Sequence, residues 1–513
     1  MILENLYRQF FLFVGLCLVF SLILSCKKNN EIPVSKDSIT ILYFGDERIF
    51  HQDNWGSEAT YWIFLPLVSH VGDDRGEIRP VLAESWTHSD DYKTWTVKLR
   101  KDIFWHDGVQ MTAHDIKFSL DLIKKVFEGA GNIPGLKCEL IDEFTFKWIL
   151  ENPISKLDTY QVYYPKHLLE NLDPKNYFDW DFWKEPVGNG PYKFVRNIPK
   201  TMVEVEVNPN YFGSKPKIKK AILKFSQTPS LQELLSGNVD AITYVPRDFL
   251  FKIKDDKRFK SFYSWGGLIE SMIWNHNDPL FEDAKARKAL TMALNRMELA
   301  EVLNYPKDVP ISDALYSRNQ RIKSDVPPAI KFNPTKALQL LKECGWQDTN
   351  QDNILDKNGT DFRFTVIVEE INTIMATYIQ DNYRQLGIIM NIETREGNII
   401  RQRIKKNDFQ VIISRISNLT RDVVRLKTYL SKDSSIGFYN KELDSLLNVI
   451  EQTGNLEEID ILYKKMAVIL KKEIPITFLV PKVQTHIVRS EVKGLNKLYK
   501  ADPVMFLESL WIE

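Results

Sequence analysis

The alternation of apolar and polar residues is clearest in the stretch from Pro80 to Leu120. Residues 94–100 read Thr-Trp-Thr-Val-Lys-Leu-Arg, so every second side chain is apolar, which predicts a half-buried strand. The Asp-Asp pair before this strand and the His-Asp-Gly run after it are typical of turns. Thr112 then opens a helical pattern, and Asp115 imitates the acid of a capping box. The stretch therefore predicts strand, turn, strand, turn and capped helix.

The same two periodicities continue along the chain and predict an α/β protein. Residues 39–44 are predicted to form the first strand, directly after the polar stretch that ends at residue 37. Residues 362–368, 373–386 and 388–394 form a strand–helix–strand pattern, which implies parallel strands with a right-handed crossover. Further elements are predicted as helices capped by Asn333 and Asn440, a helix over 456–472 and a return strand over 476–480.

Length and charge limit the classes of function. The chain has 513 residues, which is enough for two or three domains. Its apolar content of 44% and charged content of 27% are ordinary for a globular protein. Lys and Arg number 68, as do Asp and Glu, so the net charge is zero. Nucleic acid is not expected as the main partner, because binding phosphates needs a surplus of basic charge.

The N-terminus predicts export and a lipid anchor. The apolar run from Phe10 to Leu24 is shorter than the roughly 20 residues of a membrane-spanning helix and fits a signal peptide. The run ends in Ile-Leu-Ser-Cys, which resembles a bacterial lipobox with Cys26 as the lipidated residue. We therefore expect a signal peptide over 1–25, a tether over 26–37 and a place in the cell envelope, on its periplasmic or extracellular face. An uncleaved membrane anchor is the alternative.

Two cysteines remain in the mature chain, Cys138 and Cys344. Both lie in apolar patterns and are predicted to be buried. The sequence does not decide whether they form a disulfide, which exported proteins can contain. No Cys/His cluster has the spacing of a zinc site, so neither a metal nor a cofactor is expected. Residues 348–359 resemble the start of a calcium loop, but they lack its central Gly and final Glu, which favours a solvated turn.

Candidates for catalysis are few. His106 and Asp107 form a potential acid/base pair, although an Asp before a Gly is more simply a turn residue. Glu369 and Glu370 are adjacent, and neighbours on a strand point to opposite faces. The chain contains no Gly-x-Ser-x-Gly nucleophile elbow. We therefore predict that the protein is not an enzyme and has no catalytic residue.

Several short segments, in their order along the chain, resemble a known family. These are 82–86 (Leu-Ala-Glu-Ser-Trp), 105–108 (Trp-His-Asp-Gly), 112–116 (Thr-Ala-His-Asp-Ile), 164–169 (Tyr-Pro-Lys-His-Leu-Leu), 188–192 (Gly-Asn-Gly-Pro-Tyr) and 281–290. Together they resemble family 5 of the extracellular solute-binding proteins, the peptide- and nickel-binding receptors of ABC importers. Each block is weak singly, and the order and spacing of the blocks carry the resemblance.

The resemblance implies a two-lobed periplasmic-binding-protein fold, type II-like, with a ligand cleft between the lobes. Its expected parts are lobe 1 (38–60, 187–275 and 482–513), an extra subdomain of lobe 1 (61–186) and lobe 2 (276–481). The implied function is a lipid-anchored, monomeric receptor that captures an oligopeptide or related small solute by hinge closure. It would deliver this ligand to an ABC permease. A secreted hydrolase and a receptor-like sensing or adhesion scaffold are the alternatives.

The resemblance also implies a ligand site. Glu47 falls where peptide receptors can carry a ligand-facing acid. Those receptors have a Gly-Trp pair, followed three residues after the Trp by an Asp that binds the ligand's amino group. Here Ser414 and Arg415 replace Gly-Trp, Ile416 comes next, and Asn418 replaces the Asp. The expected site therefore lacks the acid at this position and carries a cation in place of an aromatic wall, which favours an anionic or N-blocked ligand or a peptide held in another register. Glu47 as the source of the missing negative charge is the alternative.

Overall fold

The structure is a computed structural model, and it describes most of the chain. The described residues are 37–44, 60–70, 78–126, 135–157, 161–226, 228, 230–245, 248–313, 327–417, 423–495 and 507–513. The predicted signal peptide, Cys26 and the tether up to residue 36 lie outside them. Among the described residues, no helix is both long and apolar enough to cross a membrane.

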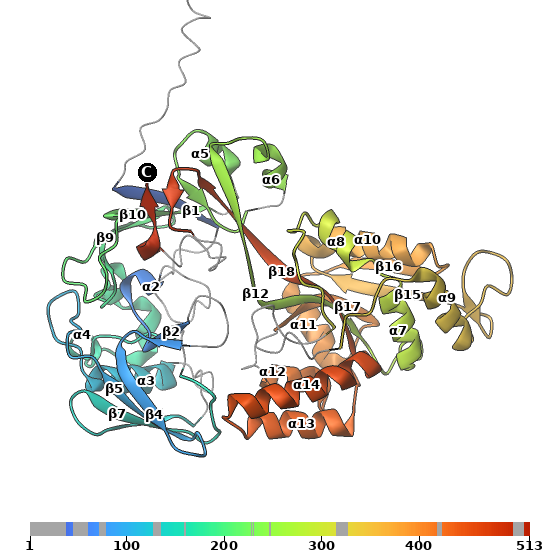
Figure 1. Ribbon diagram of the computed structural model, residues 1–513, viewed down its shortest axis with the longest axis horizontal. Helices are drawn as coiled ribbons and strands as arrows, with labels where there is room; N and C mark the ends of the chain where they lie inside the picture. Colours follow the sequence, from blue (N-terminus) through green and yellow to red (C-terminus); the bar gives the residue numbers. More distant parts are fainter. Residues whose placement is uncertain are drawn as a thin grey trace, which may run out of the picture.

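Two long antiparallel strands join the two lobes of the molecule (Figure 1). They are β12 (Phe259–Trp274) and β18 (Ile476–Arg489). The predicted return strand over 476–480 is too short, because β18 continues past Pro481 for eight further residues to Arg489. A proline removes one ladder donor, and strands accept it most readily at an irregularity. Pro481 pairs with Ile269 beside a shift in register between the two strands, so the ladder tolerates it there.

One ten-stranded sheet runs through both lobes, in the order β16-β15-β17-β12-β18-β11-β1-β10-β9-β8. The strand predicted at 39–44 is confirmed as β1, which lies parallel to β10 and β11. Two helices, α5 (Leu231–Leu235) and α6 (Asp248–Ile253), pack on this part of the sheet. The remaining strands of this part are β8 (Tyr192–Ile198), β9 (Met202–Val207), β10 (Lys220–Ser226) and β11 (Ala241–Ile242).

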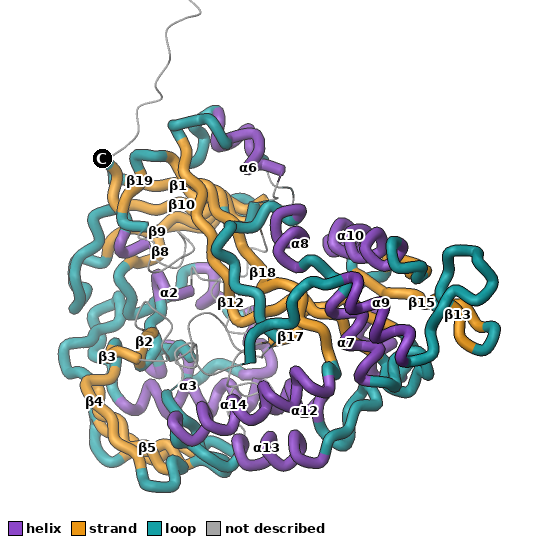
Figure 2. The backbone as a smooth tube through the Cα atoms, turned by 45° about the vertical axis from the view of Figure 1, so that its right-hand side comes forward, coloured by secondary structure: helices purple, strands orange, loops and turns teal. Residues whose placement is uncertain are grey.

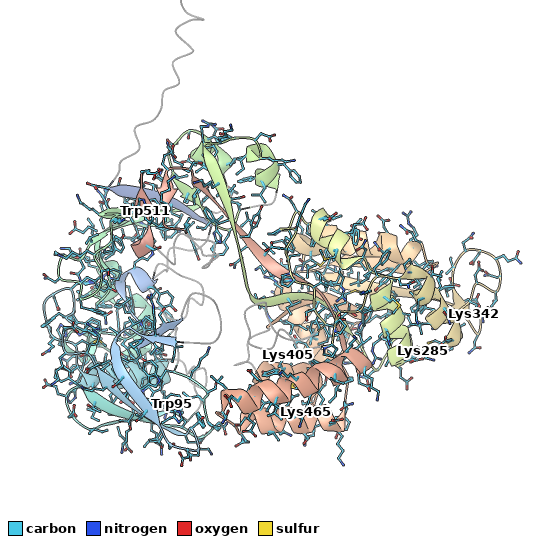
Figure 3. The ribbon with its side chains drawn as sticks, in the orientation of Figure 1. Trp95, Lys285, Lys342, Lys405, Lys465 and Trp511 are labelled. Atoms are coloured by element: carbon cyan, nitrogen blue, oxygen red, sulfur yellow. The ribbon has the colours of Figure 1, made fainter. Side chains whose placement is uncertain are left out.

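A separate four-stranded sheet extends the first lobe, in the order β4-β5-β7-β6. Its strands are β4 (Ala83–His88), β5 (Thr94–Leu99), β6 (Lys137–Leu140) and β7 (Thr145–Ile149). The predicted alternation in β5 is confirmed, since Trp95, Val97 and Leu99 are buried (Figure 3 labels Trp95). This sheet and the neighbouring end of the ten-stranded sheet share one apolar core.

Helix α3 (Ala113–Val126) begins as its sequence predicts. One carboxylate oxygen of Asp115 accepts a hydrogen bond from the Thr112 N–H at 2.8 Å, which is the reciprocal bond of a capping box. The other oxygen accepts from the Lys166 N–H at 2.9 Å. Asp115 therefore also fixes the start of α4 (Lys166–Leu169), a contact that the local pattern does not reveal.

The second lobe is a layered α/β unit. The predicted strand–helix–strand pattern is confirmed: β15 (Arg363–Val368) and β16 (Ile389–Thr394) are parallel and joined through α10 (Thr373–Arg384). The apolar residues of α7, α8, α9 and α10 form a core on one face of the sheet, and those of α11 to α14 form a core on the other. Figure 2 shows α8 and α10 above β17, and α12 to α14 below it. The elements not yet given are α7 (Ala284–Met292), α8 (Arg296–Val302), α9 (Pro334–Glu343), α11 (Gly397–Lys406), β17 (Val411–Ser417), α12 (Val423–Leu430), α13 (Lys441–Glu451) and α14 (Leu456–Glu473).

Both predicted asparagine caps are confirmed. Asn333 Oδ1 accepts from the Lys336 N–H, and Asn440 Oδ1 accepts from the Leu443 N–H, each at 2.9 Å. The shorter elements are α2 (Thr60–Ile63), β2 (Val68–His70), β3 (Ile78–Pro80), η1 (Pro174–Asp179), η2 (Asp181–Lys184), β13 (Asp356–Lys357), β14 (Thr360–Asp361), η3 (Glu370–Asn372), β19 (Val492–Lys493), η4 (Leu507–Ser509) and β20 (Trp511–Ile512). The lobe boundaries at 275 and 482 stay predictions.

Candidate functional site

Charged side chains gather where the parallel strands of the second lobe end. Arg415 lies near the end of β17, and Glu270 is its register partner on β12. Glu369 is the first residue after β15, which runs parallel to β17. In open α/β sheets, ligands bind outside the carboxyl ends of the strands. This edge also lies next to the part of β12 that leads to the first lobe, so we take it as the candidate site.

An ion pair joins Arg415 to Glu369 at this edge. Each side chain keeps about a third of its surface exposed, at 31% and 30% respectively. A Cβ atom added to Gly397 would lie only 2.3 Å from Glu369 Oε1, so the carboxylate packs directly against the first turn of α11. The positive end of a helix dipole favours a carboxylate in this place. Arg415 and the start of α11 therefore both hold Glu369 in position.

Two further charges complete the cluster. Glu270 is 4% exposed, and its Oε2 accepts a long hydrogen bond of 3.4 Å from Asn372 Nδ2. Burial lowers the pKa of the Lys482 ammonium on β18, and the charge of Arg415 lowers it further. Glu270 and Glu369 act on that pKa in the opposite direction. Two cations and two carboxylates thus share this edge, and their charges cancel.

The structure brings together only some of the predicted site residues. Ser414, Arg415 and Ile416 are consecutive on β17. Ile416 is 3% exposed and packs in the core beneath α11 to α14, so its side chain is not exposed to a ligand. Glu47 and Asn418 lie outside the described residues.

Sequence reasoning missed Glu270, Glu369 and Lys482 as members of this cluster. The signal for Glu369 was present, because an acid directly after a parallel strand lies at the carboxyl edge of a sheet. Glu270 and Lys482 carried no such signal, since each sits within a strand whose edge and partners are set by distant segments.

The potential acid/base pair at His106 and Asp107 does not form. His106 Nδ1 accepts from the Gly188 N–H, and Nε2 lies 3.2 Å from the Gly190 carbonyl oxygen. Burial lowers the pKa of His106 to about 4, so the ring is neutral at pH 7. Asp107 instead bonds His167 at 2.8 Å. His106 is thus a structural residue that supports a glycine turn.

The calcium-like segment is a turn closed by its own hydrogen bonds. Asp348 accepts main-chain N–H groups of Gln351 and Asn353, at 2.7 and 3.0 Å. Asp356 accepts the Thr349 N–H at 2.7 Å. Across the part of the chain that the structure describes, no three His, Cys, Asp or Glu side chains gather as metal ligands.

The two cysteines that the structure describes do not pair. Cys138 and Cys344 are both free thiols. Burial is the main cause that raises the pKa of each to about 12. Cys138 is buried as predicted, whereas Cys344 is half-buried.

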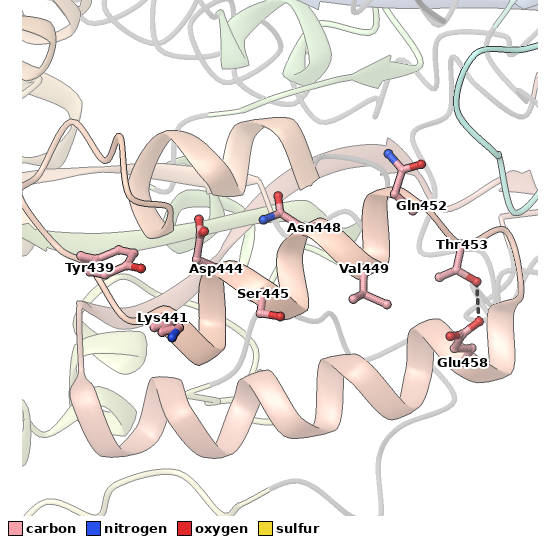
Figure 4. Close-up of a pocket in the computed structure, with 9 residues that line it drawn as sticks. All are labelled: Tyr439, Lys441, Asp444, Ser445, Asn448, Val449, Gln452, Thr453 and Glu458. Carbon is pink, nitrogen blue, oxygen red and sulfur yellow. Dashed lines mark hydrogen bonds between the residues drawn. The ribbon is translucent and has the colours of Figure 1, made fainter.

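A shallow hollow of about 630 Å³ lies along α13 (Figure 4). Thr453 Oγ1 donates to Glu458 Oε2 at 2.6 Å at one end of it. Of the predicted ligand residues that the structure describes, Ser414, Arg415 and Ile416, none lines this hollow. Its lining consists of Tyr439, Lys441, Asp444, Ser445, Asn448, Val449, Gln452, Thr453 and Glu458.

Comparison with known proteins agrees with this architecture. The family model for bacterial extracellular solute-binding proteins, family 5 Middle, matches residues 77–435. The oligopeptide-binding protein AppA of Bacillus subtilis (strain 168) is 25% identical over 482 residues, which cover 89% of this chain and 88% of that protein. Its structure in complex with a nonapeptide has a TM-score of 0.70 at 22% identity and covers 94% of this chain and 100% of that one.

Two further solved structures share the fold. The ABC transporter substrate-binding protein CtaP of Listeria monocytogenes has a TM-score of 0.78 at 22% identity, covering 93% of this chain and 99% of that one. NikZ of Campylobacter jejuni, in complex with Ni(L-His), has a TM-score of 0.74 at 22% identity and covers 93% of this chain and 100% of that one.

Proposed function

The chain belongs to family 5 of the bacterial extracellular solute-binding proteins, and on that premise we propose that it is the receptor of an ABC importer. It would capture an oligopeptide or a related small solute and deliver it to the membrane permease. The observation that carries this proposal is the pair of strands β12 and β18, which link two lobes beside a charged sheet edge. A ligand that contacts both lobes favours their closed arrangement. This mechanism needs neither covalent chemistry nor a cofactor, and the receptor would act as a monomer.

The ligand class follows from the charges of the site. We propose that Glu47, Ser414, Arg415 and Asn418 contact the ligand, together with the main chain of Ile416. Asn418 carries no charge, so it cannot neutralise a ligand ammonium, and burying such a group unpaired costs several kcal/mol. The receptor then does not rely on a free α-amino group at this position. It would bind an N-blocked or anionic ligand, or a peptide in another register.

The ion pair with Glu369 adds a condition to this proposal. Arg415 is already neutralised, so a ligand carboxylate must displace Glu369 before it can bind the guanidinium. Glu369→Gln would free Arg415, and a charge-assisted hydrogen bond contributes about 1.5–3 kcal/mol. We therefore expect this variant to bind acidic peptides about tenfold more tightly than the wild type.

Calorimetry with matched peptides, free and N-acetylated, tests both parts of the proposal. We expect N-acetylation to leave the wild-type affinity nearly unchanged and to weaken binding to Asn418→Asp. A large loss of wild-type affinity on N-acetylation would show that the receptor recognises the α-amino group and would contradict the proposal. Mass spectrometry of the recovered peptides tests the first alternative, because a secreted hydrolase would cleave them. The second alternative, a sensing or adhesion scaffold, differs from a receptor in having no permease partner.

The lipid anchor is a separate proposal that rests on the Ile-Leu-Ser-Cys boundary. We propose that residues 1–25 are removed and that Cys26 carries acyl chains, which place the receptor at the cell envelope. Each buried CH₂ contributes about 0.8 kcal/mol, so several chains hold a protein firmly. Cys26→Ser should release the protein from membranes or leave the precursor uncleaved. Mature wild-type protein that begins at Cys26 with no acyl mass would contradict the anchor.

A further inference from the structure

The two lobes also meet far from the strands that join them. Tyr92 lies in the turn between β4 and β5, and Gly454 lies in the connection between α13 and α14. A Cβ atom added to Gly454 would lie 2.2 Å from Tyr92 Cβ and 2.3 Å from its Cγ. Beside this contact, Gln452 Nε2 donates to Asn152 Oδ1 at 3.4 Å. The connection between α13 and α14 thus touches the loops beside the four-stranded sheet of the first lobe (Figure 1).

We propose that Tyr92 and Gly454 form an interlobe latch that stabilises the closed receptor and thereby sets its affinity for ligand. In Figure 1 the strands β12 and β18 cross between the lobes, above the place where α13 and α14 approach β4 and β5. Hinge opening at the strands must therefore break the contact. This role goes beyond ligand recognition, because neither residue belongs to the charged edge.

Tyr92 is held rigidly on its side of the latch. Its φ of +56° is in the left-handed region, which a tyrosine adopts only when its surroundings impose it. Its N–H donates to the Ser89 carbonyl at 2.9 Å, and its carbonyl accepts from Trp95 Nε1 at 3.0 Å and from the Ile154 N–H at 3.3 Å. Its ring stacks on His88, with the ring centroids 4.1 Å apart. These main-chain bonds fix the position of the Tyr92 Cβ, which is the atom nearest to Gly454, and the ring can move only by giving up its stacking on His88.

Gly454 is held on the other side by the start of α14. Asn455 caps this helix by accepting from the Glu457 and Glu458 N–H groups, at 2.9 and 3.2 Å. Thr453 bonds Glu458 as well (Figure 4). The φ of Gly454 lies outside the left-handed region, so its own backbone would accept alanine. The close approach of Tyr92 is what requires a glycine here.

The latch acts on ligand affinity through the population of the closed state. The apparent dissociation constant equals the intrinsic value divided by the closed fraction, so a contact made only in the closed state tightens binding at a distance. Because both sides of the contact are rigid, a methyl group at Gly454 must hold the lobes apart.

Small-angle scattering and calorimetry on Gly454→Ala test the latch. The variant should have a larger radius of gyration than the wild type without ligand. It should also bind the tightest member of a nonapeptide library about fivefold more weakly or worse. Tyr92→Gly should also increase the radius of gyration and weaken peptide binding. The double variant should bind peptide no more weakly than Tyr92→Gly alone, because both changes remove the same contact.

Gly213→Ala is the matched control. Its added Cβ would lie 2.7 Å from Tyr211 Cε1, a glycine–tyrosine contact within one lobe, so neither radius nor affinity should change. An unchanged radius together with an unchanged affinity in Gly454→Ala would overturn the latch, as would additive effects in the double variant. The radius is measured without ligand, so the latch can hold even if no peptide binds and the proposed function fails.

Discussion

Arg296→Met is expected to lower the free energy of unfolding by about 3–5 kcal/mol. Arg296 begins α8 and is 3% exposed. Its guanidinium pairs with the buried Asp313 and donates to the carbonyl oxygens of Phe478 at 2.8 Å and Ile330 at 2.7 Å. Removing it leaves the buried Asp313 carboxylate without its cation and takes one donor away from each of the two carbonyls, which costs a desolvation penalty. The effect should reach β18, because Phe478 belongs to that strand.

Urea unfolding of Arg296→Met, monitored by Trp fluorescence, checks this value. Arg363→Met is the control, since Arg363 and Asp361 form a pair whose side chains are 51% and 38% exposed, and exposed pairs contribute about 0–1 kcal/mol. Arg296→Met/Asp313→Leu should recover part of the loss, because no unpaired charge remains. Equal losses in Arg296→Met and Arg363→Met would contradict the structural role of the buried pair.

Gly188→Ala should destabilise the first lobe by about 3 kcal/mol, at the upper end of overpacking costs. Its added Cβ would lie 2.1 Å from the Ile63 carbonyl oxygen. That oxygen also accepts the N–H groups of Asn189 and Gly190, at 2.8 and 2.7 Å. The turn cannot shift away from it without losing both bonds. A Cβ atom added to Gly190 would lie 2.5 Å from the Trp62 carbonyl oxygen, so Gly190→Ala should destabilise the first lobe by a similar amount.

Thermal unfolding measures this loss. Gly213→Ala, whose Cβ meets only a tyrosine side chain, should cost much less. Truncation to Ile63→Ala should not rescue Gly188→Ala, because the nearest atom belongs to the main chain. A Gly188→Ala protein as stable as Gly213→Ala would show that the turn moves freely.

Local structure was predictable because its causes are local. The alternation in β5, the Asn333 and Asn440 caps and the β15–α10–β16 unit depend on residues a few positions apart. The order of short segments was enough to identify the family and its two-lobed fold, which the family match and the solved structures confirm. The length of β18 was not predictable, since its ladder continues on β12, more than 200 residues earlier.

The site was predictable only in part. Arg415 was predicted as a cation of the ligand site, but its partner Glu369 was not predicted. The sequence by itself determined the elements, the family and the residue types at the strand ends. Only the tertiary structure decided which charges neutralise each other and where Gly454 meets Tyr92. The physical reason is that backbone periodicity acts over one or two turns, whereas ion pairs and close approaches join segments that sheet topology and lobe packing bring together.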